Sequence, residues 1–373
     1  MIKIYDKEDC CGCGACAIRC PHHCITLSED PQGFLYPKVN LDKCVDCHLC
    51  ERVCPCLNVD ERRGNTECFS AVNPDDKVRL TSSSGGIFSM LSQAVLALGG
   101  VVFGARFDEE WNVLHDEAQT VVELVRFRGS KYVQSVTGDC YAKAQEYLKQ
   151  GREVLFSGTP CQIAGLKQFL GDDDDKLLTV EVACHGVPSP KVWREYLRYI
   201  SDGQPLARVD FRDKSTGWRD YSVVIGNKSR RHDYDEYMGC FLGNYSLRPS
   251  CFNCRFKQGS SGADITLADF WGMAATNGHL DDNKGTSLMV VFNDKAMRSL
   301  EQCGVNLIHQ DFDKAIKSNP SLVKSATRPA DCDEFWNLFC SGKTKIAIKW
   351  FGHRHRPGLN VQFKRIIRKL LHR

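Results

Sequence analysis

The sequence predicts an α+β protein in which a small double-cluster module precedes an α/β domain and a mixed α+β subdomain. Two runs of four cysteines open the chain, and beyond them apolar helix and strand patterns alternate until short strands dominate from about residue 205. At 373 residues the chain is long enough for two or three domains. We expect them at residues 1–60, 66–180 and 181–330, with a basic tail at 343–373.

The two cysteine runs share the spacing CxxCxxCxxxCP, the pattern of bacterial ferredoxins. Three closely spaced thiolates can cap one face of a cubane, and the fourth reaches the other cluster. Zinc knuckles and a disulfide framework are the alternatives, but neither requires one register repeated 34 residues later. We therefore expect electron transfer through two 4Fe-4S clusters, held by Cys10, Cys13, Cys16 and Cys54 and by Cys44, Cys47, Cys50 and Cys20.

The composition is that of a globular protein in a reducing compartment. Hydrophobic residues make up 42% of the chain and charged residues 25%. No secretory signal opens the sequence, and no apolar run reaches the roughly 18 residues of a spanning helix. We expect a cytoplasmic protein whose 21 cysteines serve as thiols and cluster ligands rather than disulfides.

Positive charge is concentrated at the C-terminal end. The net charge is +3, but residues 343–373 hold ten Lys or Arg and no acids, which leaves −7 on residues 1–342. The tail predicts a basic amphipathic helix that either docks on its own protein or makes a peripheral contact with a membrane or an acidic partner. Nucleic acid is not expected, because no base-reading motif accompanies the basic residues. The apolar positions of this helix are Phe363, Ile366, Ile367, Leu370 and Leu371.

The α/β region follows a polar linker at residues 57–70. Helices are expected at 87–98, 141–149, 161–170 and from 190 through 200. Strands are expected at 101–107, 154–156 and 177–182. The later short strands, at 207–211, 221–225, 264–267 and 287–292, predict the mixed second subdomain.

Two loops of small residues precede helices and are candidates for binding a nucleotide cofactor. The first is Ser82-Ser83-Ser84-Gly85-Gly86, and the second is Ser157-Gly158-Thr159-Pro160. Small residues let the backbone approach a phosphate, and a helix N-terminus offers unpaired amides. The same residues also suit a plain helix cap, so that alternative stays open.

Four later cysteines predict a third 4Fe-4S site. Cys251 and Cys254 form a CxxC pair, and Cys161 falls in the first turn of an expected helix, where the dipole favours a thiolate. Cys184 follows a strand, and Cys240 competes with Cys161 as the fourth ligand. A redox-active disulfide is the alternative for the CxxC pair. We expect a cluster there because two cubanes already precede it.

Seven segments stand in order between about residues 66 and 325: SSSGGIF (82–88), SKYVQS (130–135), FSGTPCQIAGL (156–166), CHGVPSP (184–190), RPSCFNC (248–254), DITLADFWG (264–272) and KGTSL (284–288). Together they resemble the family of coenzyme F(420) hydrogenase/dehydrogenase beta subunits. That family also includes chlorophyll hydroxymethyl reductases of plants and cyanobacteria and ferredoxin-fused bacterial members. The resemblance implies bound FAD, a neighbouring 4Fe-4S cluster, and reduction of an organic substrate or exchange with a deazaflavin.

The resemblance also implies which residues form the sites. The implied ligands of the neighbouring cluster are Cys161, Cys184, Cys251 and Cys254. For catalysis, Lys131 is a candidate to stabilise reduced flavin, His185 is a candidate proton donor, and Asp269 is a third candidate that could equally accept a hydrogen bond. The implied flavin-site residues are Ser83, Ser84, Gly85, Gly86, Lys131, Tyr132, Gly158 and Thr159.

The fused module indicates that electrons arrive from a ferredoxin or a similar donor. We expect a ferredoxin-linked, flavin-dependent reductase, because FAD joins one-electron carriers to the two-electron reduction of a small-molecule substrate. Two other functions stay open. One is an electron-transfer adaptor for a partner enzyme, and the other is a coenzyme F(420)-dependent dehydrogenase.

Overall fold

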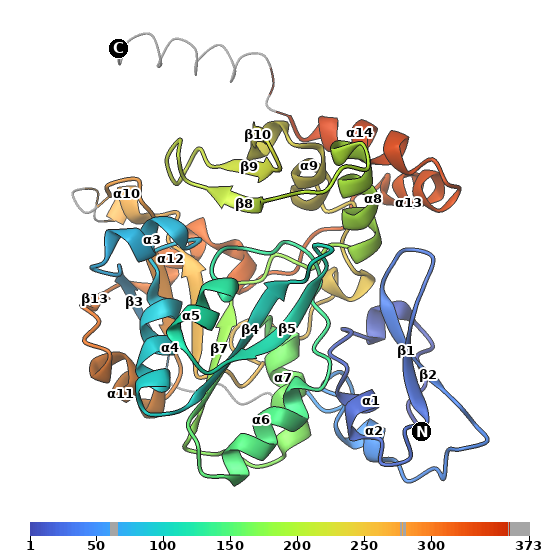
Figure 1. The fold of residues 1–373 in the computed structure, drawn as a ribbon, viewed down its shortest axis with the longest axis horizontal. Coiled ribbons are helices and arrows are strands. Elements are labelled where there is room, and N and C mark those ends of the chain that lie inside the picture. The colour runs from blue at the N-terminus through green and yellow to red at the C-terminus, as the bar shows by residue number, and fades with distance from the viewer. Residues whose placement is uncertain (60–65, 277, 279–280, 357, 359–373) are drawn as a thin grey trace.

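The computed structural model describes residues 1–59, 66–276, 278, 281–356 and 358. Three parts lie side by side (Figure 1). A cysteine-rich module begins the chain, a large sheet flanked by helices forms the middle, and a helical layer with a small sheet lies above it. The α+β class predicted from the sequence is confirmed at this level.

The cysteine-rich module consists of short elements joined by tight turns. Its elements are η1 (Lys7–Asp9), α1 (Ala15–Arg19), β1 (Ile25–Glu29), β2 (Leu35–Val39) and α2 (Leu49–Arg52). β1 and β2 pair in an antiparallel hairpin. Gly14 and His48 precede the two helices with left-handed backbones, at φ 81° and 60°. These turns keep the cysteines of each run close together.

The middle part is an eight-stranded sheet in the order β13-β3-β12-β11-β7-β6-β4-β5. Its four central strands, β11, β7, β6 and β4, run parallel, and the outer strands pair antiparallel. The carboxyl ends of the parallel strands therefore meet at one edge, where open α/β sheets bind ligands. The strands are β3 (Glu67–Ala71), β4 (Val101–Phe107), β5 (Val113–Ala118), β6 (Val154–Gly158), β7 (Leu177–Val182), β11 (Ile265–Asp269), β12 (Ser287–Val291) and β13 (Ile308–His309).

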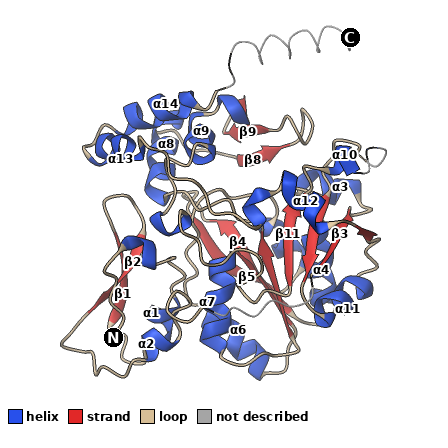
Figure 2. Cartoon of the chain, turned by 180° about the vertical axis from the view of Figure 1, so that it is seen from behind, coloured by secondary structure: helices blue, strands red, loops and turns tan. Residues whose placement is uncertain are grey.

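Helices cover both faces of this sheet. Alternate residues of β6 point to opposite faces: Val154 and Phe156 pack with α6 and α7, and Leu155 packs with α4 and α11. Figures 1 and 2 show α6 and α7 on the side of the module. The helices are α3 (Asp76–Thr81), α4 (Ile87–Ala97), α5 (Val121–Leu124), η2 (Val125–Phe127), α6 (Cys140–Lys149), α7 (Pro160–Leu170), η4 (Pro249–Cys251), α10 (Met273–Thr276), α11 (Asp294–Gln302), α12 (Phe312–Ser318) and η6 (Pro320–Leu322).

The upper layer packs helices and a three-stranded sheet around aromatic residues. Trp193, Tyr196 and Tyr237 are fully buried in its core. Its elements are α8 (Pro190–Ser201), β8 (Val209–Asp213), β9 (Ser222–Ile225), β10 (Lys228–Arg231), η3 (His232–Tyr234), α9 (Glu236–Leu242), α13 (Cys332–Cys340) and α14 (Thr344–Arg354).

The strands after residue 205 divide between two sheets, which differs from the single subdomain expected. Those near 207–211 and 221–225 form the small sheet, whereas β11 and β12 join the large one. β12 is buried along its whole length and has a strand on each side, β11 and β3. β3 also begins at Glu67, inside the expected linker. The sequence did not indicate this strand, because small and polar residues such as Cys68 and Ser70 are buried in it.

The basic tail is described only in its first part. α14 packs into the upper layer through Ala347, Ile348 and Phe351. The predicted amphipathic positions from Phe363 to Leu371 lie outside the described residues. Among the described helices, none has the length and apolar character that crossing a membrane requires.

Candidate functional site

A cavity of about 480 Å³, here called the cleft, lies beside the carboxyl ends of the parallel strands. Both small-residue loops line it, as do all three catalytic candidates. Gly85 is the one flavin-site candidate that does not line it, because it packs against β3 and β12. The structure thus brings together Ser83, Ser84, Gly86, Lys131, Tyr132, Gly158, Thr159, His185 and Asp269.

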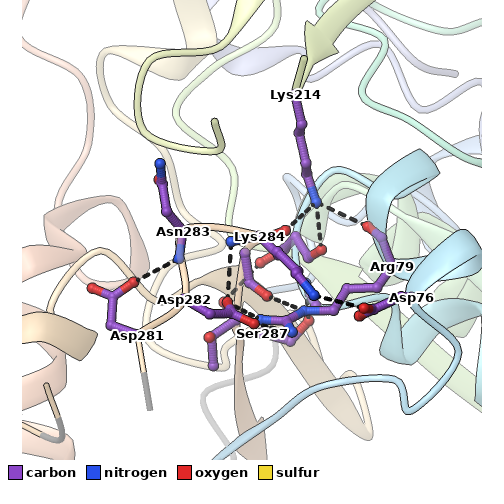
Figure 3. A network of polar contacts seen from close by, with 12 residues as sticks. Asp76, Arg79, Lys214, Asp281, Asp282, Asn283, Lys284 and Ser287 are labelled. Carbon is purple, nitrogen blue, oxygen red and sulfur yellow. Dashed lines mark hydrogen bonds and ion pairs between the residues drawn. The ribbon is translucent and has the colours of Figure 1, made fainter. Parts of the chain in front are cut away.

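Two cations that sequence reasoning missed hold the first loop in place (Figure 3). The Nζ of Lys214, which follows β8, donates to the carbonyl oxygens of Arg79, Ser84 and Lys284 at 2.8 to 2.9 Å. Burial lowers the pKa of Lys214 to about 7. Arg79 donates to the carbonyl of Gly285 and forms a two-pronged ion pair with Asp282. The loop is therefore fixed from segments far apart in the sequence.

Arg212, on β8, ties together three of the segments that line the cleft. Its side chain is 2% exposed and lies over the rings of Tyr221 and Trp271. Its guanidinium donates to the Asp269 carboxylate (2.8 Å), the Tyr132 hydroxyl (3.2 Å) and the Ser83 carbonyl (3.3 Å). Asp269 thus accepts a hydrogen bond from Arg212, which is the alternative to a catalytic role that the sequence left open.

The second loop is organised by Gln162 and His115. Gln162 Oε1 accepts from the Thr159 amide at 3.0 Å and from its hydroxyl at 3.1 Å. Its Nε2 donates to Ser135 Oγ at 2.9 Å. The His115 ring lies between Ser135 Oγ and the Ser157 carbonyl, each 3.0 Å from a ring nitrogen. Helix capping and cleft lining are therefore both roles of this loop.

We expect His115 to make the stability of this region depend on pH. Burial lowers its pKa to about 4 from a usual 6.5, so the folded protein holds it neutral. The contribution of neutral His115 to the free energy of unfolding is complete above about pH 6.5. It is lost as the pH falls towards 4, and the loss is on the order of 3 kcal/mol. Thermal unfolding of wild type and His115→Gln between pH 7.5 and 5 checks this. If the melting temperature of His115→Gln fell with decreasing pH as steeply as that of the wild type, the prediction would be contradicted.

The other two catalytic candidates, Lys131 and His185, are half-buried. Lys131 Nζ donates to the carbonyls of Arg128 (2.8 Å) and Gly129 (3.2 Å), and burial lowers the pKa of Lys131 to about 7. Lys131 is therefore no surface lysine. His185 Nε2 lies 2.6 Å from Asn244 Oδ1, and burial lowers the pKa of His185.

Six thiols line a second, smaller cavity. Four of them, from three separate segments, are the predicted ligands Cys161, Cys184, Cys251 and Cys254, here called the body thiol set, and the other two are Cys11 and Cys56 of the module. Cys161 begins α7 after β6, Cys184 follows β7, and the CxxC pair overlaps η4. Cys240 lies elsewhere, buried in the upper layer with its thiol donating to the Ile348 carbonyl at 3.4 Å. The structure therefore groups Cys161, not Cys240, with the other three.

The surroundings of the body thiol set suit an anionic group. Arg255 and Lys257 line the same cavity, and Lys257 Nζ donates to the Cys184 carbonyl at 2.5 Å. The Val187 amide donates to Cys251 Sγ at 3.4 Å. A cubane with four thiolates is negatively charged, and hydrogen bonds to its sulfurs tune it. Among the described residues, no group of three or more His, Cys, Asp or Glu converges as ligands of a single metal ion do.

The module contains two further thiol sets. Cys20, Cys44, Cys47 and Cys50, the outer thiol set, line one cavity near the N-terminus, together with Cys24. Cys10, Cys13, Cys16 and Cys54 form the inner thiol set. Cys16 and Cys54 pack with the outer set, whereas Cys13 and Cys54 pack in the same apolar cluster as Cys161 and Cys254. The inner set thus lies between the outer set and the body set.

Side chains of the body hold the inner cysteines in place. Arg248 is fully buried and donates to the Cys10 carbonyl at 2.7 Å and towards Cys10 Sγ at 3.5 Å. Gln134 and Thr137 donate to the carbonyls of Cys11 and Cys13 at 3.1 and 2.8 Å. The sequence placed Arg248 beside the CxxC pair but carried no sign of its contact with Cys10.

Comparison with known proteins follows the same division of the chain. Residues 151–309 match the family model for the C-terminal part of the coenzyme F(420) hydrogenase/dehydrogenase beta subunit. Residues 9–58 match the 4Fe-4S dicluster domain. Both the predicted family and the predicted double-cluster module are confirmed.

Two similar proteins come from Methanosarcina mazei and Methanocaldococcus jannaschii. The F subunit of the F(420)H(2) dehydrogenase of Methanosarcina mazei is 24% identical over 215 residues, which cover 53% of this chain and 61% of that protein. The coenzyme F(420)-dependent sulfite reductase of Methanocaldococcus jannaschii is 29% identical over 175 residues, 45% of this chain and 26% of that protein. The chain thus spans less than two thirds of the length of these relatives.

One solved structure aligns over much of the chain. It is the xenon-derivatised F(420)-reducing nickel-iron hydrogenase complex of Methanosarcina barkeri. The alignment covers 76% of this chain and 90% of that one, at 16% identity and a TM-score of 0.48.

Proposed function

The chain belongs to the family of coenzyme F(420) hydrogenase/dehydrogenase beta subunits and carries a 4Fe-4S dicluster domain, and we propose that it is an iron-sulfur flavoprotein oxidoreductase. It takes electrons from a ferredoxin-type donor and passes them through three 4Fe-4S clusters to FAD and on to an organic substrate. The bound clusters would supply one-electron transfer, and FAD would join it to two-electron chemistry.

The observation that carries this proposal is the order of the thiol sets. The outer set adjoins the inner set, and the inner set shares an apolar cluster with Cys161 and Cys254. The cavity of the body thiol set then shares Cys184, His185, Gly186 and Val187 with the cleft. A continuous series of thiol sites therefore leads from the module to the two loops proposed to hold flavin.

Residues of the cleft have distinct proposed roles. The two loops bind the cofactor, and Ser83, Ser84 and Thr159 are among their residues that line the cleft. Lys131 provides positive charge when an anion binds beside it, because an opposite charge favours its ammonium form. His185, on the segment shared by the two cavities, supplies or accepts a proton.

A second function is an electron-transfer adaptor for a partner enzyme. The relative from Methanosarcina mazei is named as one component of a dehydrogenase, which favours partner proteins here as well. Turnover of a small molecule by the isolated chain would favour the oxidoreductase. Electron transfer only to dyes or to a partner would favour the adaptor.

Iron and flavin analysis tests the cofactor content. We expect about 12 iron atoms per chain, four for each of three clusters, and one FAD after anaerobic purification. Acid-labile sulfide and the fluorescence of released flavin complete the measurement. Iron near eight atoms per chain would contradict the cluster proposed for the body thiol set, and absence of flavin would contradict the FAD proposed for the cleft.

A further inference from the structure

We propose that a soluble one-electron iron-sulfur carrier protein docks on residues 40–48 of the module, where Leu41 and Val45, here called the apolar patch, are exposed on the loop that bears Cys47. The inference rests on the proposed function, since it names the face at which electrons enter. One electron passes from the carrier's reduced centre to the outer site. The carrier is oxidised because it loses this electron, the outer site is reduced because it gains it, and no atom is transferred.

The outer thiol set is the end of the thiol series farthest from the cleft. Of its four cysteines, Cys47 is exposed, Cys44 is half-buried, and Cys20 and Cys50 are buried. Val45, Leu49 and His48 line the same cavity. A carrier protein therefore comes nearest to this set over the loop that bears Cys44 and Cys47, not over the side that faces the body.

The patch itself is apolar and open. Leu41 is 65% exposed and Val45 is 61% exposed. Single exposed apolar residues are common on protein surfaces, but here two lie on the loop that bears Cys44 and Cys47, and Val45 lines the same cavity as these thiols. Electron-transfer partners bury small interfaces, under about 1,200 Å² in total, so two such side chains form a large share of the contact.

The loop that carries the patch is held in place by local hydrogen bonds. Asn40 Oδ1 accepts from the Asp42 amide at 3.0 Å, and the Cys44 amide donates to the Leu41 carbonyl at 3.3 Å. The N-terminal ammonium pairs with Asp46 at 2.8 Å. Asp46 has a left-handed backbone, with φ 50°. Leu41 and Val45 are therefore presented on a structured turn, which limits the entropy lost when a partner binds.

The charges around the patch are mixed and partly paired. Asp42 and Lys43 adjoin each other, Asp46 pairs with the N-terminus, and His48 contacts Glu51. No single sign dominates, so the apolar contact supplies the recognition. Association is expected to depend only weakly on salt, because little long-range steering is available.

Reduction by a protein donor and by a small reductant separates docking from electron transfer. The probes are a reduced bacterial double-cluster ferredoxin and dithionite, each mixed with the oxidised full-length protein in a stopped-flow instrument. In Leu41→Glu and Val45→Glu, the second-order rate constant with ferredoxin should fall about tenfold. In Leu41→Glu, which lies outside the cavity of the outer thiol set, the dithionite rate and the iron content should stay at wild-type values. Leu98→Glu, 69% exposed at the end of α4, is the matched control and should change neither rate.

Several results would overturn the proposal. Unchanged ferredoxin rates in both variants would place entry elsewhere, and so would an equal loss in Leu98→Glu. Failure of the ferredoxin to reduce a wild-type chain that contains its iron would also reject the proposal. A wild-type oligomer that dissociates in Leu41→Glu would make the patch an interface between copies. Iron absent from the wild-type module would instead refute the proposed function.

Discussion

Replacing Cys254 with alanine is expected to abolish reduction of the flavin by reduced ferredoxin, while the module keeps its iron and the cleft keeps its flavin. Cys254 lies between the inner thiol set, with which it shares an apolar cluster, and the segment that adjoins the cleft. Without Cys254 the body thiol set keeps only three of its four thiols, so the cluster proposed there loses a ligand. The flavin bleaching rate should fall at least a hundredfold, the loss expected when the only route is cut. Stopped-flow absorbance of the flavin is the measurement.

Cys240→Ala is the matched control for this variant. Cys240 is a fully buried cysteine that was the competing ligand in sequence terms, yet its thiol contacts the Ile348 carbonyl in the upper layer. We expect a loss of about 1 kcal/mol of stability from the smaller side chain and normal flavin bleaching. Wild-type bleaching in Cys254→Ala would show that electrons bypass the body thiol set. Lost bleaching in Cys240→Ala would restore it as the ligand candidate.

The thiol sets could be predicted because covalent spacing fixes them. In the module, two or three residues separate successive cysteines, so short turns alone bring them together. The body thiol set was predicted with one ligand open between Cys161 and Cys240, since Cys161, Cys184 and the CxxC pair are far apart in sequence and no spacing joins them. The structure supplies the reason they meet: β6 and β7 are adjacent parallel strands, and Cys161 and Cys184 follow their carboxyl ends.

Arg212 and Lys214 could not be predicted. Both act on the first loop through backbone carbonyls that any residue could provide, and they reach it from a strand more than a hundred residues later. Such contacts leave no periodicity and no motif. The same limit applies to β11 and β12, whose apolar runs fit either sheet until the neighbouring strand is known.

Replacing Gly85 with alanine is expected to release flavin from the cleft. A Cβ at this position would lie 2.6 Å from the Ser287 amide nitrogen and 2.7 Å from the Ala71 carbonyl oxygen. Both atoms belong to strands that are paired within the sheet, so the loop must move instead. That movement pushes Ser84 and Gly86 towards the cofactor they are proposed to bind, and overpacking of this kind costs about 1–3 kcal/mol. Released-flavin fluorescence and the melting temperature measure the two effects.

Gly99→Ala separates flavin release from a general loss of stability. Gly99 has φ 73°, which alanine adopts only at a cost of about 1–2 kcal/mol, but no heavy atom lies within 4 Å of the added Cβ. It follows α4, away from the cleft, so this variant should melt earlier yet keep its flavin. In Gly85→Ala, iron in the module should stay near wild type, because the module packs against the sheet's helices α6 and α7 through α1. Full flavin occupancy in Gly85→Ala, with the melting temperature lowered, would mean that the Ser82–Gly86 loop supports the sheet without binding the cofactor.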